Sequence, residues 1–300
     1  MTAAADRLEP PRTSGLRAVA SALYRHPRAQ LGLLLAAPLG WLVIAYLGSL
    51  ALFLVTSFFS VDPTTGNVVT TPTLKNYEEI LTTEVFRTVA IRTVVMAALV
   101  TLTAIALAFP IAFYMARVAS PRVRGILVVS ILLPLWSGYL VKVYAWRLIL
   151  SQNGMLNSLL EPLGLSGPGY SDVAVWLVET YLWLPYMIVP IYAGLERIPS
   201  SLLEASSDLG GRAGLTFRRV VLPLALPAVV AGSIFTFSLT LGDYITPQLV
   251  SNTRFLGMVV YDFVGVAGNQ PLAAAYAMVP VTIMLVYLLI ARRLGAFEAL

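Results

Sequence analysis

The sequence predicts an all-α protein that crosses a membrane about six times, and two observations support this. The first is composition: of 300 residues, 58% are hydrophobic and only 12% are charged, with a mean hydropathy of +0.81. Soluble domains carry about 25% charged residues, so this chain has too few to cover a soluble globule of its size. The second is length: six apolar stretches reach the roughly 20 residues that a helix needs to cross the ~30 Å hydrocarbon core. We therefore expect lipid to be the main solvent.

The predicted spans follow these apolar stretches in order, and polar loops separate them. The first is not read as a cleavable signal peptide, because its apolar run is much longer than the about 7–15 residues typical of a signal. Several spans contain proline, which membrane helices tolerate when neighbours satisfy the freed carbonyls. The six spans are 31–58, 93–116, 125–149, 173–195, 226–249 and 271–291. The stretches 60–87, 151–172 and 251–271 are predicted to be outer loops, the first two from their many turn-forming residues.

The basic residues are distributed unevenly, and this sets the predicted orientation. The opposite loops hold only four of the 20 Lys and Arg, and two more fall within the third span. The positive-inside rule places the richer side in the cytoplasm. We therefore expect a cytoplasmic N-terminal tail at 1–30, a transmembrane domain at 31–291 and a cytoplasmic C-terminal tail at 292–300. The fourteen basic residues on this side are Arg7, Arg12, Arg17, Arg25, Arg28, Arg117, Arg122, Arg124, Arg197, Arg212, Arg218, Arg219, Arg292 and Arg293.

Several classes of function are excluded by what the sequence lacks. There is no cysteine, and the single histidine, His26, lies in a polar flank, so no metal site or cofactor is expected. A nucleotide-binding P-loop is absent, because neither lysine, Lys75 nor Lys142, follows a glycine. No nucleophile elbow or H-E-x-x-H motif occurs. Only Asp243 lies clearly inside a span, with Glu179 nearer an outer end, so a paired-aspartate protease is also disfavoured. We therefore do not expect an enzyme. Because the charged residues flank the membrane spans, we also do not expect a nucleic-acid-binding protein.

One polar stretch, Glu204–Pro223, interrupts the apolar spans on the basic side. Ser201 and Glu204 have capping-box spacing, which predicts a short helix. Gly210 is expected to end that helix in a left-handed conformation. The residues "LTFRRVV" can form another turn, and Pro223 is expected to set the entry into the fifth span. From the residues alone, a well-capped connector at the lipid interface and a docking site are equally good readings.

The spacing in this stretch resembles the EAA motif of ABC importer permeases. Glu204-Ala205-Ser206, three residues, Gly210, nine residues and then "VVLP" is similar to the pattern E-A-A-x3-G-x9-I-x-L-P, with serine at the third position and valine at the isoleucine position. The resemblance implies a type I ABC importer permease (MetI-like) fold with a coupling loop at 197–223. The loop would dock on a cytoplasmic ATPase subunit, which hydrolyses ATP. Glu204 would either contact that subunit or only cap the short helix to which Glu204 belongs. The implied coupling residues are Glu204, Ala205, Ser206, Gly210, Leu222 and Pro223.

Other segments resemble spermidine/putrescine-type permeases. They are "TLKNYEEIL", "LPLWSGYLVKVYAWRLIL", "NGMLNSLL" and "FSLTLGDYITPQLV". The resemblance implies a polyamine importer in a bacterial inner membrane, with a second and different permease, two ATPase subunits and an extracytoplasmic solute-binding protein. An importer for another small solute is the nearest alternative. An ion-coupled secondary carrier is a third, although no inverted repeat with broken helices supports it.

Asp243 provides a physical argument for a cationic solute. A carboxylate at membrane depth is costly and usually faces a cavity or a partner. Asp243 lies roughly 24 Å beyond Pro227 at 1.5 Å per residue, and Gly242 and Pro247 should loosen the helix around it. Aromatic faces could add cation–π contacts, although an interfacial belt explains them too. The competing role for Asp243 is an ion pair with Lys142 or Arg147. The candidate aromatic residues are Trp136, Tyr139, Tyr181, Trp183 and Tyr244.

Overall fold

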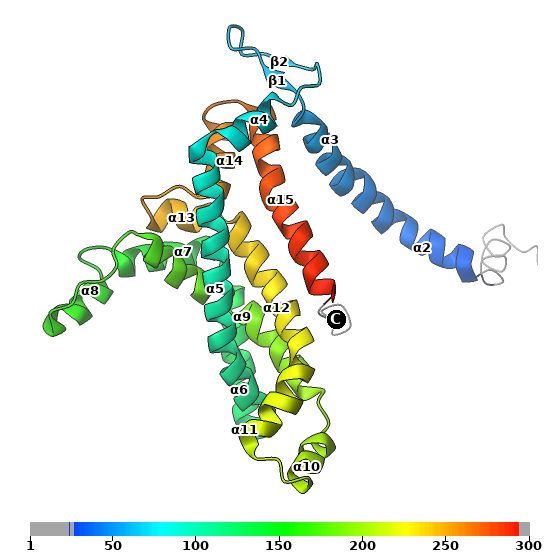
Figure 1. The fold of residues 1–300 in the computed structure, drawn as a ribbon, viewed down its shortest axis with the longest axis vertical. Coiled ribbons are helices and arrows are strands. Elements are labelled where there is room, and N and C mark those ends of the chain that lie inside the picture. The colour runs from blue at the N-terminus through cyan, green and yellow to red at the C-terminus, as the bar shows by residue number, and fades with distance from the viewer. Residues whose placement is uncertain (1–23, 25–26, 294–300) are drawn as a thin grey trace, which may run out of the picture. The chain divides into compact units, whose positions relative to one another are not determined.

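The computed structural model describes Tyr24 and residues 27–293, which Figure 1 shows as a ribbon. Most of the predicted N-terminal tail, including His26, and the predicted C-terminal tail beyond Arg293 lie outside the described residues. The chain divides into two compact units, Met1–Val55 and Thr56–Leu300. Within the described residues, five helices are long and apolar enough to span a membrane, and a bent helix pair is a sixth candidate. The prediction of an all-helical protein with about six membrane helices is confirmed.

The first unit contains the first predicted span. It consists of α2 (Pro27–Trp41), the π-helical segment η1 (Leu42–Leu47) and α3 (Gly48–Thr56), which together form an apolar run over Gln30–Thr56. The side chains that the structure describes between residues 30 and 55 are all exposed or half-buried, although most are apolar. A helix that is apolar on every side and covered by no neighbour is suited to lipid.

The core of the second unit is a bundle of long helices. The three that pack most closely are α5 (Glu84–Arg117), α9 (Asp172–Glu196) and α12 (Leu222–Gly242), and α15 (Gln270–Arg293) lies against α12. Small residues let α9 and α12 approach closely. A Cβ built on Gly194 would lie 2.3 Å from that of Ala228, and one on Gly232 would lie 2.9 Å from the sulfur of Met187. Such contacts replace the hydrophobic driving force that is missing in lipid.

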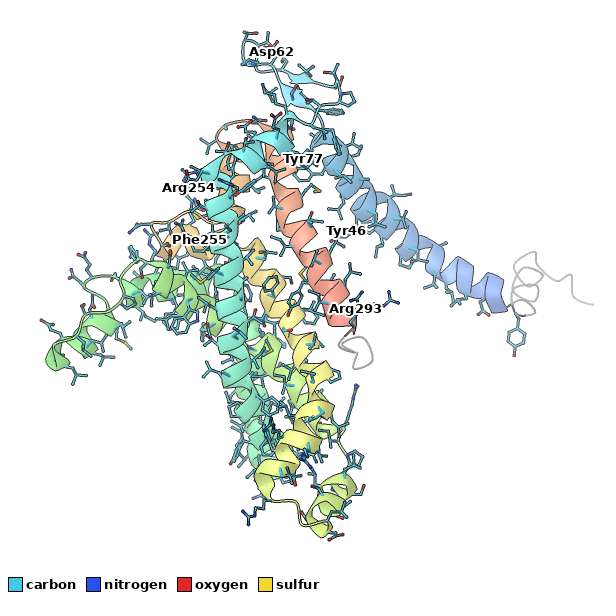
Figure 2. All side chains as sticks on the ribbon, in the orientation of Figure 1. Tyr46, Asp62, Tyr77, Arg254, Phe255 and Arg293 are labelled. Atoms are coloured by element: carbon cyan, nitrogen blue, oxygen red, sulfur yellow. The ribbon has the colours of Figure 1, made fainter. Side chains whose placement is uncertain are left out.

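The two ends of this bundle differ. At one end lie the short helices α4 (Lys75–Thr82) and α14 (Leu256–Gly265) and a small hairpin, β1 (Ser60–Val61) with β2 (Val68–Val69). Figure 2 labels Asp62, Tyr77 and Arg254 at this end. The Thr64 hydroxyl and the Thr64 N–H both donate hydrogen bonds to the Asp62 carboxylate. These bonds, the hydroxyl bond most of all, lower the pKa of Asp62, and they close the hairpin turn. The opposite end carries α10 (Ser200–Asp208) and α11 (Ala213–Thr216) (Figure 1).

The third predicted span, 125–149, is not one straight helix. It is broken into α6 (Pro121–Trp136) and α7 (Tyr139–Leu150), which meet at 94°. The helix stops at Trp136, and Ser137 (φ −76°, ψ 140°) and Gly138 (φ −57°, ψ 138°) leave the helical conformation between α6 and α7. The Pro134 carbonyl is satisfied instead by the Ser137 hydroxyl at 2.8 Å and by the Lys142 ammonium at 3.3 Å. The chain continues through α8 (Met155–Leu160) and the 3₁₀ turn η2 (Glu161–Leu163).

The fifth predicted span, 226–249, has different ends in the structure. A single helical run extends over Ala213–Gly242, through the π-helical segment η3 (Phe217–Val221) into α12. Pro223 was expected to set the entry into this span, yet the helix passes through it, because the wider π turn accommodates the missing N–H. The run then stops at Asp243, and α13 (Ile245–Val250) starts a new direction. The α14 helix, within the predicted outer loop 251–271, was not expected.

Candidate functional site

The predicted capping box at the start of α10 is wrong. The helix begins at Ser200, so Ser201 already lies inside it, and the N-cap position is taken by Pro199, which has no side-chain acceptor. Pro199 is extended (φ −63°, ψ 139°) and Leu202 donates to its carbonyl at 3.2 Å. Glu204 and Ala205 are both exposed on this helix. Because no capping box forms, Glu204 is not used to hold the start of its own helix.

The turn that follows α10 depends on two consecutive glycines. Gly210 has a φ of +77°, which confirms the predicted left-handed conformation. Gly211 donates to the Ser206 carbonyl at 2.8 Å, and a Cβ on Gly211 would lie 2.6 Å from that oxygen. Sequence reasoning missed Gly211, because only a close approach of two backbone segments, not a motif position, requires it. Both glycines restrict the chain to one turn geometry.

The serine at the third motif position has a structural role. The Ser206 hydroxyl lies 2.8 Å from the Thr216 hydroxyl, which joins α10 to α11 across the turn. Leu222 and Pro223, at the end of the motif, are exposed at the start of α12. The predicted coupling residues therefore belong to one small helix–turn–helix at the end of the bundle, as Figure 1 shows.

Two arginines hold the end of α9, just before this helix–turn–helix. The Arg117 guanidinium, at the end of α5, donates through Nη2 to the carbonyls of Leu195 and Ile198, the latter at 2.7 Å. Arg124 donates from Nε to the Met115 carbonyl at 3.0 Å. It also pairs with Glu196 at 3.4 Å. The carbonyls at the end of α9 and just before α10 are thus held by a fixed positive charge, which is favourable at a helix C-terminus.

Asp243 lies at the break between α12 and α13. Its Oδ1 accepts hydrogen bonds from the N–H groups of Ile245 at 2.9 Å and Thr246 at 3.3 Å, so it caps the start of α13. Its Oδ2 accepts from the Thr246 hydroxyl at 2.6 Å. The Tyr139 hydroxyl, on the first residue of α7, lies 2.6 Å from both oxygens and donates to them. The two helix breaks of the bundle are therefore joined through one carboxylate.

The predicted aromatic residues divide into two groups. Tyr139 stacks on Trp183 at 5.9 Å between ring centroids, so these two lie at the Asp243 cluster. The ring contacts of Tyr181 and Tyr244 are with other aromatic residues. Tyr181 packs on Trp146 and Tyr244 stacks on Tyr261, while Trp136 is 91% exposed.

The alternative partners predicted for Asp243 are wrong. Among the ion pairs of the described residues, which join Arg92 to Asp172, Arg124 to Glu196 and Arg254 to Asp262, none includes Asp243. Lys142 donates to the Pro134 carbonyl, because the break between α6 and α7 frees that oxygen. Arg147 lies over the ring of Tyr170, 5.8 Å from its centroid. Asp243 is satisfied by hydroxyl and amide donors rather than by a base.

Comparison with known proteins decides the family. Residues 108–296 match the family described as the binding-protein-dependent transport system inner membrane component. That match covers more than half of the chain, from the second half of α5 past the end of α15. The chain belongs to this family.

Relatives of the permease extend the likeness over its full length. It is 43% identical over 309 residues to the inner membrane ABC transporter permease protein YdcU of Escherichia coli K12, with 98% of each chain covered. It is 30% identical over 221 residues to the spermidine/putrescine transport system permease protein PotB of the same strain, covering 72% of this chain and 79% of that one.

Solved structures share the permease fold. A bacterial ABC transporter involved in the import of the acidic polysaccharide alginate matches with a TM-score of 0.70 and 15% identity, over 92% of this chain and 98% of that one. The permease is thus a multi-pass inner membrane protein and an ABC importer transport subunit, not an enzyme. This membership sets aside the ion-coupled carrier.

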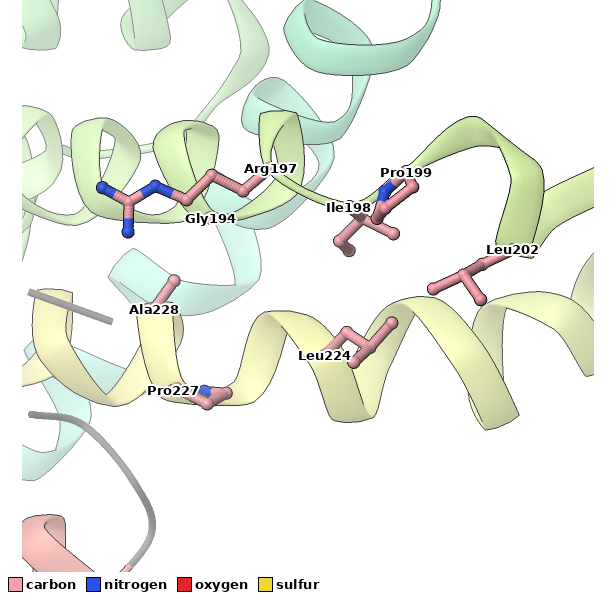
Figure 3. Close-up of a pocket in the computed structure, with 8 residues that line it drawn as sticks. All are labelled: Gly194, Arg197, Ile198, Pro199, Leu202, Leu224, Pro227 and Ala228. Atoms are coloured by element: carbon pink, nitrogen blue, oxygen red, sulfur yellow. The ribbon is translucent and has the colours of Figure 1, made fainter. Parts of the chain in front are cut away.

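A groove lies beside the start of the helix–turn–helix in this permease. Its volume is about 310 Å³, and Figure 3 shows its lining from α9, α10 and α12. The lining is mostly apolar, with one base, Arg197. The residues drawn are Gly194, Arg197, Ile198, Pro199, Leu202, Leu224, Pro227 and Ala228. The groove therefore separates the end of α9 from the start of α12 along a mostly apolar surface.

Sequence reasoning missed one acid of the permease bundle. Glu179 lies in α9, roughly 10 Å along the helix from Asp172, and is 1% exposed. It interacts electrostatically with Asp243 and lies beside Thr240 of α12. A spacing could have found it, because Glu179 and Trp183 are four residues apart and so share a helix face. The predicted site therefore includes a second carboxyl group.

Proposed function

We propose that this permease forms the translocation path for a polyamine, spermidine or putrescine, which an extracytoplasmic binding protein delivers. The observation that carries the proposal is Asp243, a buried carboxylate at a helix break with the stacked rings of Tyr139 and Trp183 beside it. An ammonium group loses hydration on entering the membrane, and a carboxylate with aromatic faces offsets that loss. The likeness to a spermidine/putrescine permease supports the same solute. A related importer for another small solute is the alternative.

We also infer the assembly that this permease needs. Its partners would be a second, different permease, two cytoplasmic ATPase subunits and the binding protein, and both termini would be cytoplasmic. The helix–turn–helix of α10 and α11 would dock on an ATPase subunit. Support comes from Glu204 and Ala205, which are exposed, and from Leu209 at the turn, which is 89% exposed although it is apolar. Together these exposed side chains give the tip a surface, partly polar and partly apolar, that a partner subunit can contact.

The test is uptake by the reconstituted importer. The permease, its permease partner, the ATPase and the binding protein would be placed in proteoliposomes with ATP inside. Uptake of radiolabelled putrescine and spermidine would be compared with that of a zwitterion, glycine betaine, and an anion, molybdate. We expect ATP-dependent uptake of the two polyamines only. Uptake of either of the other two, with none of polyamine, would overturn the solute assignment and leave the permease role in place.

A further inference from the structure

The cluster around Glu179 contains unsatisfied polar atoms. In the described part of the chain, five buried side-chain polar atoms have no hydrogen-bond partner, and four of them lie here. They are Glu179 Oε2, Thr180 Oγ1, Trp183 Nε1 and Thr240 Oγ1. The first three come from neighbouring turns of α9, and the fourth comes from α12, which packs against it. Buried polar groups are normally paired, so such a concentration marks a place where water or a polar ligand can bind.

The two acids of the cluster are in different states. Asp243 is saturated, because its oxygens accept from Tyr139, Ile245 and Thr246. Glu179 is more deeply buried and keeps one oxygen free. An ionised carboxylate inside a bundle is very costly without a counter-cation. The free acceptor capacity therefore belongs to Glu179, while Asp243 contributes a negative charge close to it.

The chemistry of the free atoms selects the kind of cation. A primary ammonium has three donors and no acceptor, and Glu179 Oε2 and Thr240 Oγ1 can accept from it, whereas the Trp183 Nε1–H is itself a donor and needs another partner, such as water. The stacked rings of Tyr139 and Trp183 add aromatic faces near the same charge. A hard metal ion takes six or more oxygens. No group of three or more His, Cys, Asp or Glu able to hold a metal occurs among the residues searched, which are those that the structure describes.

We propose that Glu179, with the Thr240 hydroxyl and the negative field of Asp243, binds one primary ammonium group of the transported solute. The proposal rests on the polyamine function above and names the residue that receives the charge. Asp243 then acts as a positioning residue, since it holds the break of α12 and the hydroxyl of Tyr139 in place. Glu179 is covered in this conformation, so the solute reaches it when the two breaks move apart.

The test is thermal unfolding of the assembled importer, without the binding protein, as putrescine is added at constant ionic strength. We expect putrescine to raise the unfolding temperature of the wild type, whereas tetramethylammonium, which has no N–H donor, does not. Glu179→Gln keeps the shape of the side chain and removes its charge. It should raise the half-saturating putrescine concentration by about tenfold or more, as expected for loss of a charged hydrogen bond. Glu161→Gln, at an exposed position, is the matched control and should behave as wild type.

Two outcomes would overturn the proposal: an equal putrescine shift in Glu179→Gln and wild type, or no shift in the wild type. If the variant does not assemble, a measurement on the wild type decides instead. A hydrophobic carbodiimide should modify Glu179, as read by peptide mass spectrometry, and putrescine should protect it. Modification at the same rate with and without putrescine would contradict the site.

Uptake by the same preparations separates this proposal from the proposed function. If putrescine shifts the unfolding of the wild type through Glu179 but is not transported, the solute assignment fails and the ammonium site stands. If putrescine is transported equally well by the wild type and by Glu179→Gln, the polyamine function stands and the site fails.

Discussion

The hydroxyl of Tyr139 lies 2.6 Å from both carboxylate oxygens of Asp243 and donates a hydrogen bond to them. Tyr139 is the first residue after the break between α6 and α7, and Asp243 is the residue at which α12 stops. Broken helices inside a membrane expose backbone groups that must be satisfied within the protein. Here one carboxylate caps α13 and also accepts a hydrogen bond from α7, so the two breaks share one polar contact. This link is where we expect the path to open.

Removing this link should loosen both breaks. Tyr139→Phe deletes only the hydroxyl and leaves the ring stacked on Trp183. We expect the assembled importer to lose about 1 kcal/mol of stability, given the modest value of most side-chain hydrogen bonds in membranes. Thermal unfolding of the purified complex measures this loss. Tyr144→Phe, at an exposed position of the same helix, is the control. Identical stability of the two variants would show that the Tyr139–Asp243 hydrogen bond does not stabilise the complex.

The turn after α10 should not tolerate side chains at its two glycines. Gly210→Val forces a branched residue into a left-handed backbone, at a cost of about 1–2 kcal/mol. Gly211→Ala places a methyl group against the Ser206 carbonyl. Both variants should still insert in the membrane, but we expect ATP to be hydrolysed without solute uptake. Gly214→Ala has open space and an ordinary backbone, so it should couple normally. Normal uptake by Gly210→Val at normal abundance would contradict the docking role.

Arg117 should be needed for transmission of movement rather than for folding. Arg117→Lys keeps the charge but cannot donate in the same fork geometry to the carbonyls of Leu195 and Ile198. We expect ATP hydrolysis to continue while its stimulation by loaded binding protein falls several-fold. Arg122→Lys, at an exposed position in the first turn of α6, is the matched control. If both variants respond to the binding protein equally, the arginine does not join the loop to the bundle.

Reporter fusions test the orientation. Fusions after residue 20, within 117–124 and within 205–215 should read as cytoplasmic, because these segments lie on the side that holds 14 of the 20 basic residues. A fusion in the hairpin turn at Gly66 should read as extracytoplasmic. A cytoplasmic signal at Gly66 would reverse the assignment of the first two spans.

The fold followed from the sequence where a signal is long. Apolar runs such as 173–195 and 271–291 predicted helices that the structure extends by one or two residues at each end, Asp172–Glu196 and Gln270–Arg293. The breaks could not be located in the same way, because α6 ends two residues after Pro134 at a 94° bend, whereas Pro190 lies within an unbroken helix. Which outcome follows depends on whether neighbours satisfy the backbone groups at a break, as Lys142 does for the Pro134 carbonyl, and that is a tertiary property.

The site was predictable only in part. Asp243 was found because a charge inside an apolar run is conspicuous, and Gly210 because its motif position demands a left-handed backbone. Glu179 was set aside as lying near the end of a span, although in the structure it is almost fully covered by its neighbours. Its importance depends on α12, which brings Thr240 and Asp243 beside it from sixty residues further along the chain. No local pattern contains that contact.

The most direct test of the polyamine path is putrescine uptake by proteoliposomes that contain the complete importer with Asp243→Asn. Asparagine can still accept the N–H groups of Ile245 and Thr246, so α13 stays capped and the complex should assemble. Its lost charge should lower uptake by about tenfold or more, while Asp262→Asn, which only removes an exposed pair with Arg254, should transport normally. Full ATP-dependent putrescine uptake by Asp243→Asn would contradict the account.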